Sequence, residues 1–87
     1  MDNQLIMISG EHCGYCRYIE PLAEKLCDDN DILFIKLQSG NLPNAIPEPK
    51  ALPTFIFRVD SEMKETWSGS KLDKLKEKLA NYFGSLK

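Results

Sequence analysis

The sequence has little excess charge, few cysteines and no long hydrophobic run. Eleven basic and thirteen acidic residues leave a formal net charge of -2 over 87 residues, which gives no electrostatic reason to expect nucleic acid or anionic lipid as a partner. No apolar stretch approaches the roughly 20 residues of a membrane-spanning helix, and the opening "MDNQLIMISGEHC" lacks the features of a secretory signal. We therefore expect a cytoplasmic protein, with neither nucleic acid nor a membrane as a partner.

Disorder and repeats are absent as well. A hydrophobic content of 43% is ordinary for a packed domain. A chain of this length buries roughly 60% of the surface that it exposes when unfolded, which is enough for one core. The sequence therefore predicts a single domain over residues 1–87, and we expect it to be a monomer.

The first half of the chain predicts a strand, a helix and a second strand. Residues 4–9 are apolar, are too short for a helix and end at a glycine. Residues 32–37 are apolar on both alternating faces apart from Lys36, which is typical of a strand covered on both sides. Between the two strands, an apolar stripe at helical spacing continues past Pro21 and comprises Ile19, Leu22, Ala23 and Leu26. This βαβ order predicts a parallel pair of strands.

The second half predicts a hairpin followed by a helix. Three prolines make residues 38–52 an irregular connector. Residues 53–59 and 64–67 read as antiparallel strands joined by a turn at 60–62. Ser70 begins a capping signal for a helix, whose buried stripe is Leu72, Leu75, Leu79, Tyr82, Phe83 and Leu86. The fold class is therefore α/β, with a four-stranded mixed sheet.

Two of the three cysteines stand three positions apart at the predicted start of the first helix. At this spacing Cys13 and Cys16 lie on one helix face about a turn apart, so their sulfur atoms can reach disulfide distance. The unpaired N–H groups and the dipole of the first turn stabilise an anion there, and such a position lowers a thiol pKa from about 8.5. Cys13 is the predicted nucleophile, and Cys16 is the predicted resolving thiol.

Zinc binding and inert burial are the competing interpretations of this pair. Structural zinc usually takes four ligands, and the only further candidates are the adjacent His12 and the distant Cys27. A CxxC at a strand-to-helix junction in a βαβ pattern favours a redox dithiol over both alternatives, so we expect no metal. Cys27 lies roughly 16 Å of helix beyond Cys16, too far to bridge, and is expected to be a core residue.

Three separated segments resemble the thioredoxin superfamily. "CGYCRYIEPLAEKL" is similar to the active-site helix of thioredoxins, and "ALPTFIFRVD" resembles the segment in which a cis proline precedes a strand. Gly69 matches the glycine that opens a flat surface beside the dithiol. The resemblance implies a minimal thioredoxin fold, of glutaredoxin size, with helices on both faces of the sheet. It also implies a cis peptide between Leu52 and Pro53.

The same resemblance implies a thiol-disulfide oxidoreductase that reduces protein disulfides through a mixed disulfide. It implies no bound cofactor, because the redox-active disulfide Cys13–Cys16 is reduced by an external donor, either a thioredoxin reductase or glutathione. In the family, the backbone of the residue before the cis proline pairs with an extended substrate strand. The residues expected to bind substrate are His12, Gly14, Tyr15, Leu52, Pro53 and Gly69.

Departures from the thioredoxin pattern keep other functions open. His12 stands where thioredoxins usually carry tryptophan, and Gly14-Tyr15 replaces a dipeptide that usually contains proline. Such a tyrosine is similar to glutaredoxins, CGYC also occurs in periplasmic disulfide isomerases, and "TWSG" resembles small redoxins that serve ribonucleotide reductase. The alternatives are therefore a glutaredoxin-like redoxin that uses glutathione or serves that enzyme, and a non-catalytic binding module with a thioredoxin fold.

A proton relay is also missing from its usual place. Thioredoxins keep a buried aspartate six residues before the first cysteine, where this chain has Met7. The candidate replacements are Glu11, His12 and Lys36. The aromatic residues that could line a substrate surface, or belong to the core, are Tyr15, Tyr18 and Trp67.

Overall fold

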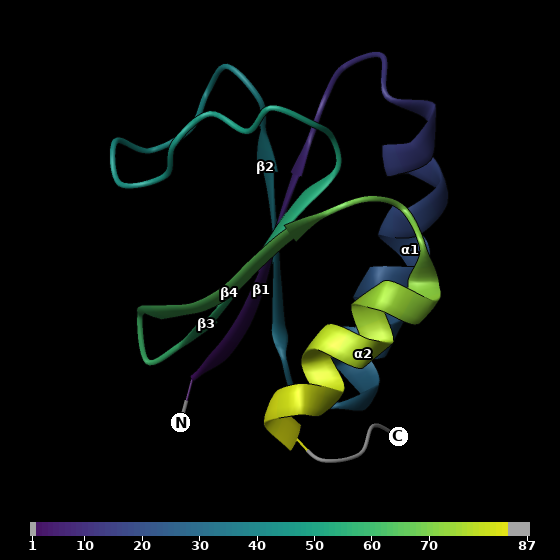
Figure 1. Ribbon diagram of the computed structural model, residues 1–87, viewed down its shortest axis with the longest axis vertical. Helices are drawn as coiled ribbons and strands as arrows, with labels where there is room; N and C mark the ends of the chain where they lie inside the picture. The colour runs from purple at the N-terminus through teal and green to yellow at the C-terminus, as the bar shows by residue number, and fades with distance from the viewer. Residues whose placement is uncertain (1, 84–87) are drawn as a thin grey trace.

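The computed structural model describes residues 2–83, which form four strands and two helices (Figure 1). The elements follow one another in the predicted order. Their bounds are β1 (Asn3–Ser9), α1 (Gly14–Asp29), β2 (Leu33–Gln38), β3 (Thr54–Val59), β4 (Glu62–Ser68) and α2 (Leu72–Phe83). Residues 39–53 contain neither a helix nor a strand, as their prolines predict.

The four strands form one mixed sheet in the order β2-β1-β3-β4. Strands β1 and β2 pair in parallel, and their register places Met7 beside Lys36. Strand β3 runs antiparallel to both β1 and β4. The predicted βαβ unit and the predicted hairpin are therefore confirmed, and β1 and β3 lie at the centre of the sheet.

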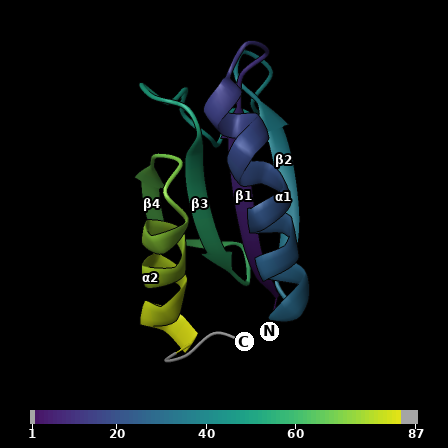
Figure 2. The same cartoon turned by 90° about the vertical axis from the view of Figure 1, so that its right-hand side faces the viewer.

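Both helices lie on the same face of the sheet, as the side view shows (Figure 2). Alternation along the strands directs every second side chain to that face, where Leu5, Met7, Phe55 and Phe57 are almost fully buried. The helices contribute apolar side chains to the same cluster, namely Ile19, Ala23, Leu26, Leu75 and Leu79. We call this cluster the helix-side core. Cys16 belongs to it, and Cys13 packs against it.

The opposite face is covered by the connector. Ile46 of the connector is buried against a smaller cluster of sheet residues, Ile6, Ile8 and Ile56. Helices on both faces were expected from the family resemblance, and that detail is wrong for residues 2–83. The physical reason is the composition of the connector, in which prolines at 43, 47 and 49 prevent a helix. The covering side chain is carried by an irregular loop instead.

The helix bounds agree closely with the sequence pattern. Helix α1 continues through Pro21, as the apolar stripe predicts, and ends at Asp29. The first backbone hydrogen bond of α2 runs from the Leu75 N–H to the Lys71 carbonyl (3.2 Å), so this helix begins one residue later than a cap at Ser70 would place it. The predicted stripe residue Leu86 and the side chain of Phe83 lie outside the part that the structure describes.

The hairpin turn is tighter than the sequence suggested. Strand β4 begins at Glu62, so only Asp60 and Ser61 connect it to β3. Both residues have positive φ angles, 52° and 70°. Two-residue loops of this kind match the twist of the flanking strands, and they normally favour asparagine and glycine. Because neither residue here is glycine, the sequence alone does not indicate a two-residue loop.

Candidate active site

Cys13 is the N-terminal cap of α1. Its backbone is extended (φ -98°, ψ 100°), and its sulfur accepts a hydrogen bond from the backbone N–H of Cys16 at 3.1 Å. This N–H is one of the groups that the first turn of a helix leaves without an intrahelical partner. A sulfur that carries negative charge at this position therefore gains a hydrogen bond and the favourable end of the helix dipole.

Cys13 and Cys16 are joined by a disulfide, with their Cα atoms 5.2 Å apart. The two sulfur atoms differ in access, because Cys16 is 2% exposed and belongs to the helix-side core, whereas Cys13 is only half-buried. A molecule in solution can therefore reach Cys13 more easily than Cys16. The predicted roles require such an asymmetry, because a nucleophile must be reached from solution and a resolving thiol need not be.

The segment around Pro53 lies against the dithiol. The peptide between Leu52 and Pro53 is cis, as expected from the family resemblance. The Gly69 N–H donates a hydrogen bond to the Pro53 carbonyl at 3.0 Å. Gly69 has a φ of 121°, a backbone conformation that residues other than glycine rarely adopt. The two segments expected to border the dithiol on this side are therefore held together by a hydrogen bond.

Gly10 was not among the predicted site residues, although it determines how closely this segment approaches the dithiol. A Cβ atom at this position would lie 2.6 Å from the Leu52 Cδ1 atom and 3.8 Å from the Cys13 Cβ atom. The glycine therefore allows the Leu52 side chain to pack beside Cys13. Its position at the end of an apolar strand, directly before the active-site helix, was the available sequence signal.

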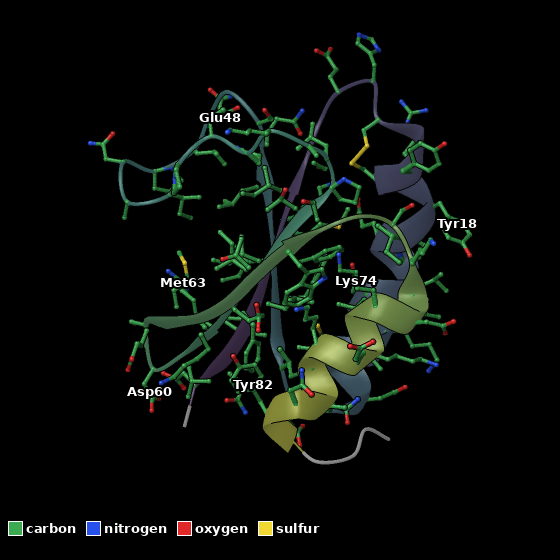
Figure 3. All side chains as sticks on the ribbon, viewed as in Figure 1. Tyr18, Glu48, Asp60, Met63, Lys74 and Tyr82 are labelled. Carbon is green, nitrogen blue, oxygen red and sulfur yellow. A yellow bond between two sulfur atoms is a disulfide. The ribbon has the colours of Figure 1, made fainter. Side chains whose placement is uncertain are left out.

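Helix α1 carries two exposed tyrosines near its N-terminus. Tyr15 and Tyr18 are 71% and 62% exposed, and Tyr18 points outward from α1 (Figure 3). They line an open cavity of about 830 Å³ between α1 and the start of α2. The predicted residues His12 and Gly14 are exposed in the same region of the chain. Trp67, by contrast, is buried and stacks on Phe55 with ring centroids 5.6 Å apart, so it belongs to the core.

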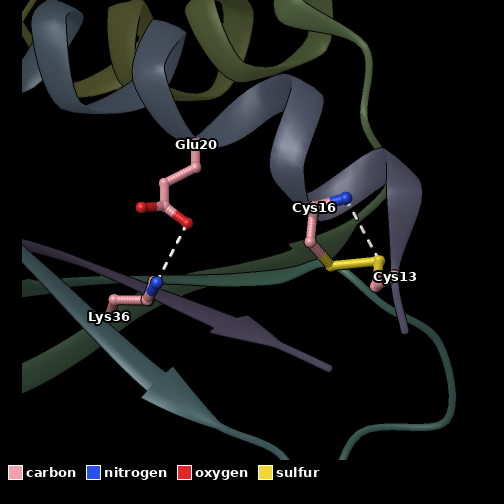
Figure 4. A network of polar contacts seen from close by, with 4 residues as sticks. All are labelled: Cys13, Cys16, Glu20 and Lys36. Atoms are coloured by element: carbon pink, nitrogen blue, oxygen red, sulfur yellow. Dashed lines mark hydrogen bonds and ion pairs between the residues drawn. A yellow bond between two sulfur atoms is a disulfide. The ribbon is translucent and has the colours of Figure 1, made fainter. Parts of the chain in front are cut away.

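A polar pair lies beneath the dithiol, in the space between α1 and β2. The Lys36 Nζ atom is 3.1 Å from the Glu20 Oε1 atom (Figure 4). Together with Cys16, these two side chains line a cavity of about 460 Å³. Met7 is completely buried at the place of the missing aspartate. Of the candidate bases, Lys36 and Glu11 line this cavity, while His12 is exposed in the turn before Cys13.

Metal binding finds no support around the cysteines. Within the described residues 2–83, no group of three or more histidine, cysteine or acidic side chains is close enough to hold a metal ion. Neither helix of that part has the combination of length and apolar character that a membrane span requires.

Cys27 is a free thiol, fully buried in the helix-side core as expected.

Cys27 provides a prediction about stability at alkaline pH. Burial, and secondly the charge of Glu24, raises the pKa of the Cys27 thiol from 9.0 to about 12. The folded protein keeps this thiol protonated, whereas the unfolded chain releases the proton near pH 9.0. The neutral thiol therefore contributes stability that is fully present below pH 9 and is lost as the pH rises toward 12. We expect Cys27→Ala to lose less of its free energy of unfolding than the unchanged protein over that range.

Urea denaturation of the two oxidised proteins at neutral pH and at intervals above pH 9 measures this difference. Lysine deprotonation affects both proteins alike, so the comparison isolates the thiol. Parallel pH profiles for the two proteins would contradict the assignment of Cys27 as a buried neutral group.

Comparisons with known proteins agree with this geometry. The family model "Thioredoxin" matches residues 1–81. Thioredoxin H2 of Arabidopsis thaliana is 35% identical over 83 residues, covering 90% of this chain and 62% of the relative. A chicken (Gallus gallus) thioredoxin is 29% identical over 76 residues, covering 84% of this chain and 72% of that protein. This chain therefore spans about three fifths of the length of the Arabidopsis protein.

Solved structures give the same result for the fold. The crystal structure of thioredoxin f2 from Chlamydomonas reinhardtii superimposes with a TM-score of 0.75 at 26% identity, covering 98% of this chain and 82% of the other. Fasciola hepatica thioredoxin gives a TM-score of 0.77 at 24% identity, covering 93% and 81%. A family model that matches nearly the whole chain, a CxxC disulfide at a helix start and this sheet lead to one conclusion: the chain belongs to the thioredoxin family.

Proposed function

We propose that this protein is a thiol-disulfide oxidoreductase that reduces protein disulfides. The observation that carries the proposal is the position of Cys13, whose sulfur caps α1 and accepts the Cys16 N–H at 3.1 Å. That position favours the thiolate, and the thiolate is the form that attacks a disulfide. Membership of the thioredoxin family supports the same activity.

The reaction proceeds in two exchanges. The Cys13 thiolate attacks one sulfur of a substrate disulfide, so that a mixed disulfide forms and the other substrate sulfur leaves with the electron pair and takes up a proton. Cys16 then attacks the Cys13 sulfur, which releases the second substrate thiol and forms the Cys13–Cys16 disulfide. The dithiol loses two electrons, and the substrate gains them. No bound cofactor takes part.

The substrate surface that we propose surrounds Cys13 and comprises His12, Gly14, Tyr15, Leu52, Pro53 and Gly69. The structure gives no hydrogen bond within residues 2–83 to the backbone N–H or carbonyl of Leu52. A backbone with unused polar groups beside a nucleophile is suited to pairing with an extended strand of the substrate. Such pairing supplies affinity with little dependence on the substrate sequence.

The donor that regenerates the dithiol is proposed to be a thioredoxin reductase, with glutathione as the alternative. The thioredoxin relatives favour the reductase, while Tyr15 in the dipeptide keeps the glutaredoxin-like alternative open. We further propose that the protein acts in the cytoplasm as a monomer of one domain. The buried free thiol of Cys27 is consistent with a compartment that keeps thiols reduced.

Insulin reduction tests the proposed activity. An oxidoreductase accelerates the precipitation of insulin by dithiothreitol in proportion to its own concentration, whereas a binding module leaves the rate unchanged. The same assay with NADPH and either thioredoxin reductase or glutathione plus glutathione reductase identifies the donor. No acceleration with any of the three reductants would refute the proposed function.

Gly69→Ala is predicted to slow insulin reduction about tenfold, because a small displacement of a substrate-positioning segment has large kinetic effects. A side chain at a φ of 121° also costs about 1–3 kcal/mol of stability. Gly40→Ala is the matched control, since Gly40 has a φ of 91° and lies in the connector. We expect both variants to lose stability in urea and only Gly69→Ala to lose turnover while folded. Equal turnover in the two variants would remove Gly69 from the substrate surface.

A further inference from the structure

The resolving step poses a problem that the apolar surroundings of Cys16 do not solve. Its thiol must lose a proton before it can attack the mixed disulfide. Cys16 is 2% exposed. The residues of β1, β3 and β4 that share its cluster include Met7, Phe55 and Trp67, and those of α2 are Leu75 and Leu79. None of these side chains accepts a proton, so the acceptor must lie on another side of Cys16.

The cavity of about 460 Å³ between α1 and β2 is the polar side of Cys16. Glu20 stands four residues after Cys16 on α1, which places the two side chains on one helix face. Figure 4 shows both pointing from the helix toward the sheet. Lys36 meets Glu20 from β2, where the strand register sets it beside Met7. The pair therefore lies next to the position that the missing aspartate would occupy.

We propose that Glu20 accepts the proton of the Cys16 thiol during resolution, and that Lys36 is the positioning residue that holds its carboxylate. This role rests on the proposed oxidoreductase function. A cavity of this size with polar walls has room for a water molecule that bridges the thiol and the carboxylate. The Glu20 and Lys36 side chains are 32% and 49% exposed, so the proton can pass on to solvent.

Resolution begins at the Cys16 thiol. The S–H bond of Cys16 breaks, and its proton passes through water to a Glu20 oxygen. The Cys16 thiolate attacks the Cys13 sulfur, the new Cys13–Cys16 bond forms, and the bond from Cys13 to the substrate breaks. The electron pair leaves on the substrate sulfur, which takes a proton from solvent, and Glu20 returns its own proton to solvent. When the disulfide is reduced again, Glu20 supplies a proton to the departing Cys16 thiolate.

The other charged groups around the cavity are less suited to this role. They are Glu11, which is exposed in the turn before the dithiol, Arg17 on α1 and Lys36 on β2. Arginine and protonated lysine have no lone pair to accept a proton. Glu20 is the carboxylate that both shares the helix face of Cys16 and is held in place by a cation. A surface ion pair of this kind contributes little to stability, so its removal leaves the fold intact.

Equimolar 5,5′-dithiobis(2-nitrobenzoic acid) separates the two exchanges in the reduced protein. Attack by Cys13 releases one thionitrobenzoate, and attack by Cys16 then releases the second in a step independent of protein concentration. We expect Glu20→Gln to slow the second release about tenfold near pH 6.5, which is less than the roughly 10²–10⁴-fold typical of general acid–base catalysis, because solvent reaches the partly exposed site. The difference should shrink as the pH rises, because hydroxide can then remove the Cys16 proton whether or not the carboxylate is present. The first release should keep its rate.

Two further variants identify the cause of such a loss. Every protein in this assay, including the parent, carries Cys27→Ala, which removes the third thiol. Glu24→Gln removes the same charge one helical turn away, from a residue that does not line the Cys16 cavity, and should behave like the parent. Lys36→Gln should slow the second release about threefold, because it leaves an acceptor that is no longer held. An unchanged second release in Glu20→Gln at every pH, or an equal loss in Glu24→Gln, would overturn the proposal. Loss of the first release in the parent would instead refute the proposed function itself.

Discussion

Replacing Cys13 with serine is expected to reduce insulin reduction to the rate without protein. The hydroxyl of serine does not ionise near neutral pH, so the helix start that favours a thiolate has no nucleophile to stabilise. Cys16 cannot replace it, because it is 2% exposed and a substrate disulfide does not reach its sulfur. The loss should therefore be complete rather than partial.

Cys27→Ala is the control for this variant, since it also removes one thiol but from the core. It should keep the turnover of the unchanged protein. If Cys13→Ser kept more than a few per cent of the activity while Cys27→Ala lost it, the assignment of the nucleophile would be wrong.

The second large effect is expected for Cys16→Ser, which should stop turnover but leave the first attack intact. Cys13 still forms the mixed disulfide, and no thiol remains one helical turn away to resolve it. Each protein molecule should consume one substrate disulfide and then remain attached to it. Non-reducing gel electrophoresis and mass spectrometry should detect a covalent complex of the reduced variant with an equimolar protein substrate.

The complex should disappear when dithiothreitol is added in excess and should not form with the Cys13→Ser, Cys16→Ser double variant. Full multiple turnover by Cys16→Ser would show that an outside thiol resolves the mixed disulfide. In that case the protein would work by a one-cysteine route, as the glutaredoxin-like alternative allows.

The dithiol was predictable from sequence because its chemistry is local. The spacing of Cys13 and Cys16 and the start of a helix decide which faces they share, and both features can be read from neighbouring residues. The cis peptide at Pro53 was predictable only through the family resemblance, because X–Pro bonds are cis in about 5–6% of cases. The parallel pairing followed from the order of apolar segments, which restricts the topology strongly.

The surroundings of the dithiol were not predictable in the same way, because they depend on contacts distant in sequence. Lys36 lies beside Met7 because of the register between β1 and β2, and this register is set only when the two strands pair. Lys36 was a candidate base, but its partner Glu20 was not foreseen, although its four-residue spacing from Cys16 was a usable signal. Trp67 was assigned either to a substrate surface or to the core, and its alternation along β4 places it in the core.

The placement of both helices on one face also could not be read from local pattern. An amphipathic stripe shows that a helix is covered on one side, but not which face of the sheet covers it. The resemblance supplied an expectation from longer proteins, and the proline-rich connector of this chain replaces the helix with a loop.

Alkylation of the reduced protein tests most directly the claim that Cys13 is the thiol that attacks. A short pulse of iodoacetamide under native conditions at neutral pH, followed by peptide mapping of the single cysteine variants and the unchanged protein, ranks the three thiols by reactivity. Cys13 should carry nearly all of the label, Cys16 little, and the buried Cys27 none until the protein is unfolded. Faster labelling of Cys16 or Cys27 than of Cys13 would contradict this assignment and the mechanism built on it.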